Sequence, residues 1–243
     1  MTETVERTAT GAILYDRSII NQISDSRFRA SGWPHVEPLA GDMGSAGRGR
    51  TLFVGNVPRQ FVLRHYRRGG LFGRLVRDLY VWTGADDTRP FREWRMLAKM
   101  AEYGLRVPRP AAARYVRHGP FYTADIMTVR IPGVRPLSRV LAEGPRPAEF
   151  WAQLGAEICV FHAAGVYHAD MNAFNLQLDA EDQLWMLDFD RGRLREPGPW
   201  QQETLKRLHR SLRKLCRLNP GLHFGRREWD ALLAGYFEAS RSA

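Results

Sequence analysis

Three things are scarce in this sequence: cysteine, lysine and long hydrophobic runs. Only Cys159 and Cys216 occur among its 243 residues, too few for a disulfide framework or a zinc site, so we expect reduced thiols in the cytoplasm. No run of about 18 apolar residues is present, so we expect no membrane-spanning helix. Residues 1–7 contain two glutamates and no apolar segment, so we expect no signal peptide.

Positive charge, by contrast, is abundant and is almost entirely arginine. The chain has 36 lysines and arginines against 26 aspartates and glutamates, a net charge of +10, and only Lys99, Lys206 and Lys214 are lysines. The excess predicts an anionic partner: nucleic acid, an anionic membrane surface or a phosphorylated substrate. A generally basic protein without such a partner has the same composition. No helix-turn-helix, zinc-finger or aromatic RNA-binding motif is present, so nucleic acid has no support beyond charge.

Hydrophobic patterning predicts an α+β fold with two lobes. The first half contains short runs typical of strands, at 11–16, 50–54, 59–66, 112–117 and 121–130, and helical spacing at 71–81 and 89–103. The second half is mainly helical, over 147–164, 199–218 and 226–237, with short strands at 176–178 and 184–187. The sequence Ile131-Pro132-Gly133 is the best break. We therefore expect a strand-rich N-terminal lobe over residues 1–130 and a helical, catalytic C-terminal lobe over 131–243.

One polar loop carries the chemistry. It runs from His168 to Asn175 and is followed by Asp188-Phe189-Asp190 at the end of a hydrophobic strand. Protein kinases use this order of residues to place a carboxylate beside two metal-binding side chains. We expect Asp170 to orient the acceptor hydroxyl or to act as its general base. Asn175 and Asp188 are the expected ligands of Mg²⁺, which prefers oxygen. The pattern predicts a bilobal, protein-kinase-like phosphotransferase that uses ATP.

The residues around these three differ from those of regulated kinases. Asp190 replaces the usual glycine, so it could bind metal, substrate or Arg191. His168 is more easily explained as a packed structural histidine than as a proton shuttle. Ala169 stands where many regulated kinases have arginine, and the interval between Asp190 and the helix predicted from residue 199 is short. We therefore expect an activity that phosphorylation does not switch.

The first half supplies candidates for binding the nucleotide phosphates. Gly41, Gly44, Gly47 and Gly49 precede a predicted strand, and Gly44 and Gly47 would let backbone N–H groups approach phosphate. Their spacing also fits an ordinary flexible turn. No lysine lies in the strand at 59–66, so Arg64 would neutralise the phosphates in its place.

Arg64 needs a partner to fix its side chain, and Glu93 is the only early acid of the predicted helix at 89–103. In a kinase site these two residues form an ion pair. The alternatives are an outward-facing Arg64 and a surface pair of Glu93 with a neighbour on its own helix. Thr128 and Arg130 lie where a kinase chain pairs with adenine through its backbone, and this assignment rests on position alone.

Four longer runs stand out in the sequence: Arg64-His65-Tyr66-Arg67-Arg68-Gly69-Gly70, Phe91-Arg92-Glu93, His168-Ala169-Asp170-Met171-Asn172 and Asp188-Phe189-Asp190-Arg191-Gly192-Arg193. Together they resemble those of the 3-deoxy-D-manno-octulosonic acid (Kdo) kinases, in the lipopolysaccharide kinase group of Gram-negative bacteria. The resemblance implies ATP-dependent phosphorylation of the 4-hydroxyl of Kdo on Kdo-lipid A (Kdo-lipid IVA), in lipopolysaccharide core biosynthesis. It further implies a peripheral protein at the cytoplasmic face of the inner membrane, with no nucleic acid and no obligate protein partner.

Two alternatives to a Kdo kinase stay open. Heptose or other small-sugar kinases of the same fold are near relatives, and the acceptor is not fixed by the motifs. A non-catalytic, basic kinase-like binding module is the other. The missing lysine favours that second reading, but Asp170, Asn175 and Asp188 are all present and Arg64 takes the lysine's place.

Two basic segments are candidates for contact with an anionic lipid. In the first, Arg67, Arg68, Arg74 and Arg77 alternate with apolar residues, as in a helix that lies on a membrane surface. The second is the helix at 199–218, which carries Lys206, Arg207, Arg210, Arg213, Lys214 and Arg217. The first segment could equally pack within its own lobe, and the second could be a solvated basic face.

Overall fold

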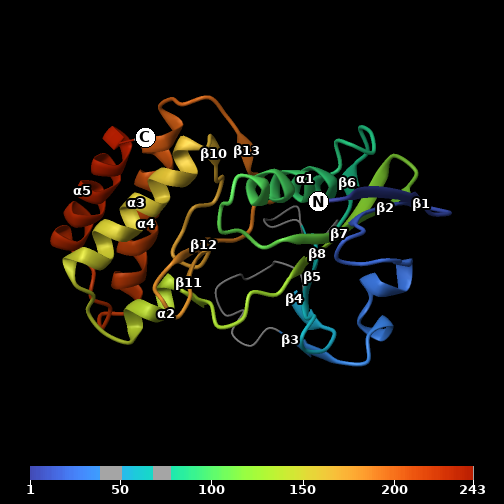
Figure 1. The fold of residues 1–243 in the computed structure, drawn as a ribbon, viewed down its shortest axis with the longest axis horizontal. Coiled ribbons are helices and arrows are strands. Elements are labelled where there is room, and N and C mark those ends of the chain that lie inside the picture. Colours follow the sequence, from blue (N-terminus) through green and yellow to red (C-terminus); the bar gives the residue numbers. More distant parts are fainter. Residues whose placement is uncertain (39–50, 68–77, 243) are drawn as a thin grey trace. The chain divides into compact units, whose positions relative to one another are not determined.

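The computed structural model describes residues 1–38, 51–67 and 78–242. The chain divides into two compact units (Figure 1). The first unit is Met1–Glu102 with Pro108–Ile131, and the second is Tyr103–Val107 with Pro132–Ala243. The first unit is rich in strands and the second in helices, which confirms the α+β class. The predicted break after residue 130 lies one residue before the end of the first unit, whereas the return of Tyr103–Val107 to the second unit has no counterpart in the prediction.

An antiparallel sheet forms the first unit, in the order β1-β2-β7-β8-β5-β4-β3, with β6 also paired to β8. Its strands are β1 Glu3–Arg7, β2 Gly11–Asp16, β3 Val36–Pro38, β4 Thr51–Val54, β5 Phe61–His65, β6 Tyr80–Val81, β7 Pro110–His118 and β8 Phe121–Val129. The two predicted hairpins, β4 with β5 and β7 with β8, are confirmed.

The helix predicted at 71–81 is wrong where the structure describes it. Residues 78–79 are not helical, and Tyr80–Val81 is the strand β6, which pairs with Tyr122 and Phe121 of β8. The Tyr80 and Tyr122 rings pack with centroids 5.5 Å apart. Cross-strand packing of these aromatic residues outweighs the local helical spacing. The rest of that prediction, residues 71–77, lies outside the described residues.

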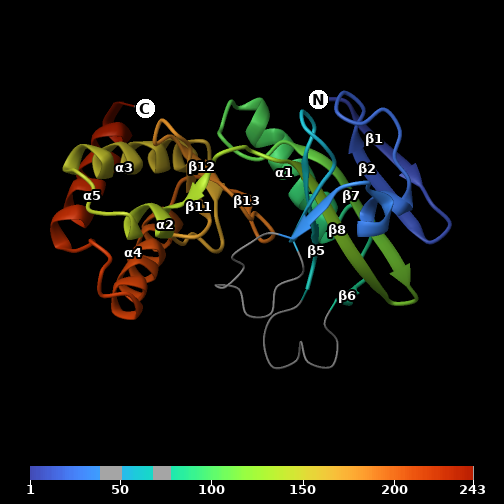
Figure 2. The same ribbon diagram turned by 90° about the horizontal axis from the view of Figure 1, so that it is seen from below.

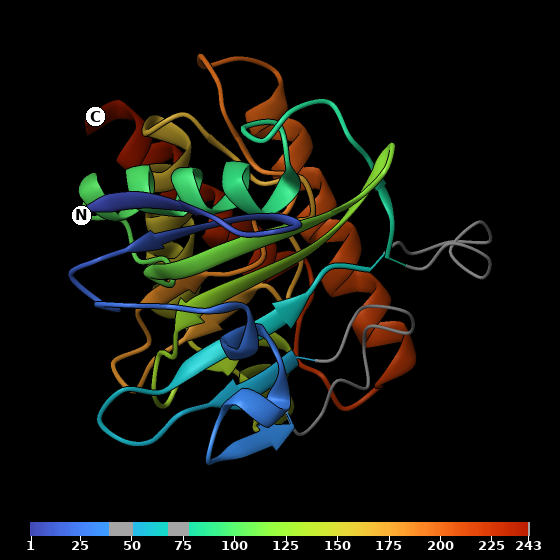
Figure 3. The ribbon, with the colours of Figure 1, turned by 90° about the vertical axis from the view of Figure 1, so that its right-hand side faces the viewer.

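Side chains alternate between the two faces of this sheet. One face packs against helix α1 (Arg89–Glu102), the green helix of Figure 3, which buries Phe91, Trp94 and Leu97. The other face carries a core of Ile13, Leu63 and Met127, among others, with Phe28 from the short helix η1 (Asp25–Phe28). A second short helix, η2 (Ala30–Gly32), follows directly. Consecutive residues of one strand therefore meet different surroundings.

Helices dominate the second unit. They are α2 Leu137–Ala142, α3 Ala148–Ala163, α4 Trp200–Leu218 and α5 Arg226–Ser242, with small sheets formed by β9 (Arg135–Pro136), β11 (Leu176–Leu178) and β12 (Leu184–Met186), and by β10 (Val166–Tyr167) and β13 (Arg193–Leu194). The three long helices were predicted, although α5 extends beyond residue 237. None of the helices in the described ranges combines the length and apolar character needed to cross a bilayer.

Helices α3 and α5 lie side by side in Figures 1 and 2 and approach one another backbone to backbone. A Cβ atom on Gly155 of α3 would lie 1.9 Å from the carbonyl oxygen of Leu232, and one on Gly235 of α5 would lie 2.0 Å from that of Ala152. Glycine is therefore the residue that permits this contact at both points.

Candidate active site

Arg64 and Glu93 form a close ion pair in the first unit. Arg64 lies on the face of β5 that packs against α1, and its Nη2 atom is 2.5 Å from Glu93 Oε1 and 2.7 Å from Oε2. The Glu93 side chain is only 3% exposed, whereas that of Arg64 is 24% exposed. The carboxylate is thus an interior anchor and the guanidinium reaches solvent. The structure brings together the two residues that the sequence predicts to pair.

Tyr66 completes this group and was missed in the sequence. Its hydroxyl donates to Glu93 Oε2 at 2.5 Å, and the Arg64 guanidinium lies 5.0 Å from the centroid of its ring. Tyr66 is buried and stands two residues after Arg64. That period-two spacing along an extended segment is the signal that could have identified it.

Thr128 and Arg130, expected to lie along the nucleotide base, come at the end of β8. Thr128 is within the sheet, between Val62 of β5 and Pro110 of β7. The Arg130 N–H group donates to the Gln60 carbonyl oxygen at 2.9 Å, so this N–H is already used. The Arg130 side chain also donates to Gln60 Oε1 at 2.8 Å, and it lies 3.9 Å from the centroid of the Phe53 ring.

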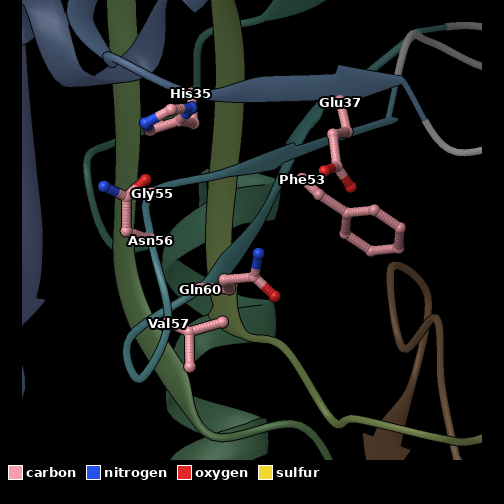
Figure 4. A pocket seen from close by; sticks show the side chains of 7 residues that line it. All are labelled: His35, Glu37, Phe53, Gly55, Asn56, Val57 and Gln60. Atoms are coloured by element: carbon pink, nitrogen blue, oxygen red, sulfur yellow. The ribbon is translucent and has the colours of Figure 1, made fainter.

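A hollow of about 350 Å³ lies next to Phe53 and Gln60 (Figure 4). It is lined by residues of β3, of β4 and of the segments next to these strands: His35, Glu37, Phe53, Gly55, Asn56, Val57 and Gln60. Two of these residues are the partners of Arg130. The predicted phosphate-loop glycines Gly44 and Gly47 lie outside the described residues.

In the second unit, the polar loop is held by hydrogen bonds between its own side chains and its backbone. Asn172 Oδ1 accepts from the N–H groups of Phe174 and Asn175, at 2.9 and 3.1 Å. Asn175 Nδ2 donates to the carbonyl oxygen of Asp170 at 2.9 Å. This bond fixes which way the Asn175 amide points, so its Oδ1 atom is presented as an acceptor. Asn172 is a loop-forming residue that the sequence analysis did not assign.

His168 joins the loop to the strand that leads to Asp188. Its Nε2 atom is 2.9 Å from the Leu187 carbonyl oxygen, and its Nδ1 atom is 3.1 Å from the Asp170 N–H nitrogen. A carbonyl can only accept, so Nε2 carries the proton and Nδ1 accepts from Asp170. Burial lowers the pKa of His168, which keeps this neutral tautomer. His168 is therefore the packed histidine that the sequence predicts, and it also ties Asp170 to Leu187.

Asn175 directly precedes β11 and Asp188 comes just after β12, so the pairing of these two strands brings them close together. The Leu187 N–H group donates to the Asn175 carbonyl oxygen at 3.0 Å, which extends the pairing of β11 with β12 by one step. Asp188 comes next, with φ of 65°, a left-handed conformation that non-glycine residues adopt at a cost. The buried Phe189 ring packs 4.8 Å from the His168 ring and holds the chain in that turn.

The oxygen atoms of Asn175 and Asp188 suit Mg²⁺. This ion usually takes one or two side chains from a protein and completes its shell with water and phosphate oxygens. In the described ranges, no three His, Cys, Asp or Glu side chains are grouped closely enough to hold a metal without such help. The two oxygen donors therefore fit Mg²⁺ bound together with nucleotide phosphates. Asp190 is half-buried and follows two residues after Asp188.

Comparison with known proteins places this site in a family context. Residues 40–236 match the Lipopolysaccharide kinase (Kdo/WaaP) family. A 3-deoxy-D-manno-octulosonic acid kinase of Vibrio parahaemolyticus is 39% identical over 226 residues, which cover 93% of this chain and 94% of that protein. The proteins of the same name from Photobacterium profundum and Stenotrophomonas maltophilia (strain R551-3) are 37% and 44% identical. These matches cover 92% and 84% of this chain, and 94% and 81% of the relatives.

Proposed function

Because this chain belongs to the lipopolysaccharide kinase (Kdo/WaaP) family, we propose that it is a Kdo kinase that transfers a phosphoryl group from ATP to the acceptor sugar. The acceptor is Kdo-lipid A (Kdo-lipid IVA), the target is its 4-hydroxyl, and the product enters the lipopolysaccharide core. The observation that carries the proposal is the loop in which His168 ties Asp170 to the strand leading into Asp188. Relatives of nearly full length share this name.

Asp170 orients the acceptor hydroxyl and takes its proton. Its backbone is fixed on both sides, by the N–H bond to His168 and by the carbonyl bond from Asn175. Because phosphoryl transfer is largely dissociative, this carboxylate contributes more through position than through early proton removal. Asn175 and Asp188 would hold Mg²⁺ together with the nucleotide, and the ion would neutralise charge on the phosphates.

Arg64 neutralises the nucleotide phosphates in the role that lysine has in other kinases. Its charge is permanent, and its forked donors match phosphate oxygens. Glu93 and Tyr66 hold the side chain from behind, and its guanidinium is partly exposed to solvent. Gly44 and Gly47 would add backbone N–H groups to the same phosphates.

The nucleoside end of ATP binds near Thr128 and Arg130. The hollow lined by Phe53 and Gln60 supports this assignment, because the Arg130 side chain contacts both residues. Since the Arg130 N–H group is bonded to Gln60, the contribution of Arg130 would come from its side chain or its carbonyl group.

Helix α4 provides a peripheral contact with the anionic inner membrane, at its cytoplasmic face. Lys206, Arg210, Arg213, Lys214 and Arg217 are exposed and recur at spacings of three, four or seven residues, so they form one stripe. Each basic residue near an anionic surface contributes about 1 kcal/mol. Charge reversal of Arg210 and Arg213 should weaken binding to anionic liposomes, whereas reversal of Arg227 and Arg241 on α5 should not. Equal effects of the two pairs would contradict a specific α4 contact.

The test of the proposed activity is direct. The purified chain, Mg²⁺, ATP and Kdo-lipid IVA in detergent micelles should yield a product heavier by one phosphoryl group in mass spectrometry. The Asp170→Ala variant should yield none while still binding ATP. A product formed equally by that variant would contradict the site, and no product with intact ATP binding would point to a heptose or another sugar as acceptor.

A further inference from the structure

The segment after Asp190 is fixed directly beside the polar loop. Strand β13 pairs with β10, with Arg193 opposite Tyr167 and Leu194 opposite Val166. The Arg195 N–H group donates to the Gly165 carbonyl oxygen at 2.8 Å. Gly165 has φ of +75°, and a Cβ atom there would lie 2.6 Å from the Arg195 carbonyl oxygen. The pairing therefore requires glycine at 165, and β10 runs straight into His168 and Asp170.

This segment carries three arginines within five residues, between Asp190 and Glu196. Arg191, Arg193 and Arg195 are all exposed. None of them forms an ion pair with a carboxylate of the described residues, whereas Arg135 and Arg146 of the same unit do. Three like charges within five residues repel one another, so an anion placed among them is favoured.

Arg193 in β13 and Arg195, just after that strand, lie on the same face as Tyr167. Arg193 is paired with Tyr167, and Arg195 is two residues further along, where its guanidinium lies 3.9 Å from the centroid of the Tyr167 ring. Stacking on the ring fixes the Arg195 guanidinium in place. Arg193 has no such partner among the described residues and keeps its forked donors available.

The course of the chain limits how far Arg193 can lie from Asp170. Tyr167 is three residues before Asp170, and paired antiparallel Cα atoms are about 5.5 Å apart. Arg193 and Asp170 Cα atoms are therefore at most roughly 16 Å apart. A sugar held at Asp170 by a hydroxyl can reach the Arg193 guanidinium with another of its groups, because the arginine side chain shortens that gap.

We propose that Arg193, supported by Arg195 stacked on Tyr167, binds the carboxylate of the acceptor sugar and so selects an acidic sugar. This rests on the proposed function, since the relatives are named as kinases of an octulosonic acid. A carboxylate accepts two parallel hydrogen bonds from one guanidinium. Such a pair fixes the orientation of the sugar and favours a sugar that carries a carboxylate. Lipid phosphate is the other anion of such an acceptor, and the experiment separates the two.

The experiment compares Arg193→Gln with Arg227→Gln, an exposed arginine of α5 that has no ion pair among the described residues. Each protein is assayed with three acceptors: Kdo-lipid IVA, its Kdo methyl ester, and the form without lipid phosphates. Esterification should lower kcat/KM of the wild-type protein and of Arg227→Gln by roughly 10- to 100-fold. Arg193→Gln should show that loss with the native acceptor and no further loss with the ester, at unchanged KM for ATP.

Two results would overturn the assignment. One is an Arg193→Gln protein as active as wild type and as sensitive to esterification. The other is a variant that responds normally to esterification but no longer to removal of the lipid phosphates, which would make Arg193 a phosphate contact. Arg193→Lys keeps the charge without the fork, so an activity between those of wild type and Arg193→Gln supports bidentate binding even if the glutamine variant is poorly folded. No product from the wild-type protein with any acceptor would instead refute the proposed function.

Discussion

The two units hold their charged site residues by different means. In the first unit, Arg64 is positioned by other side chains, Glu93 and Tyr66. In the second, Asp170 and Asn175 are positioned through the backbone, by His168 and by the Asn175 amide. A residue held by side chains can change type if its partners still fit, as the proposed role of Arg64 in place of the kinase lysine requires. A carboxylate held through its own backbone admits no such exchange.

The largest effect should come from the residues held through the backbone. Asp170→Asn preserves the size of the side chain but removes the charge, and we expect kcat to fall by about 10³-fold with ATP binding unchanged. Asp188→Asn should instead weaken binding of Mg·ATP. Steady-state kinetics and calorimetric titration of the nucleotide measure both. Near-normal turnover in either variant would remove the basis for treating this loop as the catalytic centre.

The residues held by side chains should respond in a graded way. Arg64→Ala should lower kcat/KM for ATP by roughly 10²-fold, because one preorganised charge at the phosphates is lost. Arg64→Lys should lose only about tenfold, since the charge remains without the fork. The Arg64→Ala, Glu93→Ala double variant should be little worse than Arg64→Ala, because both act as one unit. Additive losses would show that Glu93 acts separately from Arg64.

His65 in the first unit and His162 in the second have pKa values that are shifted in opposite directions. In the first unit, the hydrogen bond to Asp125 raises the pKa of His65. In the second, burial lowers the pKa of His162 to about 4, and its ring is hydrogen-bonded to Tyr236 and Thr204. His65 therefore contributes stability that is fully present below pH of about 6.5 and is lost as pH rises through its raised pKa. His162 stays neutral in the folded protein, whereas the unfolded chain binds a proton there below pH of about 6.5. The folded state therefore loses stability as pH falls from about 6.5 towards 4.

Acidification from pH 7 to 5 should thus change the stability of the two units in opposite directions. The second unit should lose about 2 kcal/mol from His162 at pH 5. Hydrogen exchange, corrected for intrinsic rates, should show faster exchange in α3 and α5 and unchanged or slower exchange in β7 and β8. His162→Asn, which does not titrate, is the control that should flatten the response of the second unit. Parallel acceleration in both units would contradict the opposite pKa shifts.

The smallest effect should come from Tyr66→Phe. This change removes the hydroxyl that donates to Glu93 and leaves the Arg64–Glu93 pair in place. We expect a loss of about 1 kcal/mol in the free energy of unfolding. The accompanying rise in KM for ATP should be a few-fold at most. A loss as large as that of Glu93→Ala would mean that Tyr66, and not Arg64, is the main partner of the carboxylate.

Sequence patterns predicted those parts of the molecule that depend on neighbours in the chain. The long helices and the two hairpins follow from periodicity and turn residues, and the spacing of Asp170, Asn175 and Asp188 reflects one loop and one hairpin. Strands as short as β6 and β3 depend on partners far away in the sequence, so no local pattern identifies them. Tyr66 and the double hydrogen bonding of His168 were missed because they require knowledge of which residues face each other. The roles of Arg64, Glu93, Gly44, Gly47, Thr128 and Arg130 in binding ATP stay predictions.

The contact between α3 and α5 has a mechanical consequence. Because Gly155 and Gly235 each face a carbonyl oxygen with no space for a methyl group, neither helix can turn about its axis or slide along its partner without collision. The pair should therefore move as one stiff block. Any flexing of the second unit during turnover would have to be absorbed by shorter elements, such as α2 and β13, and not by its longest helices.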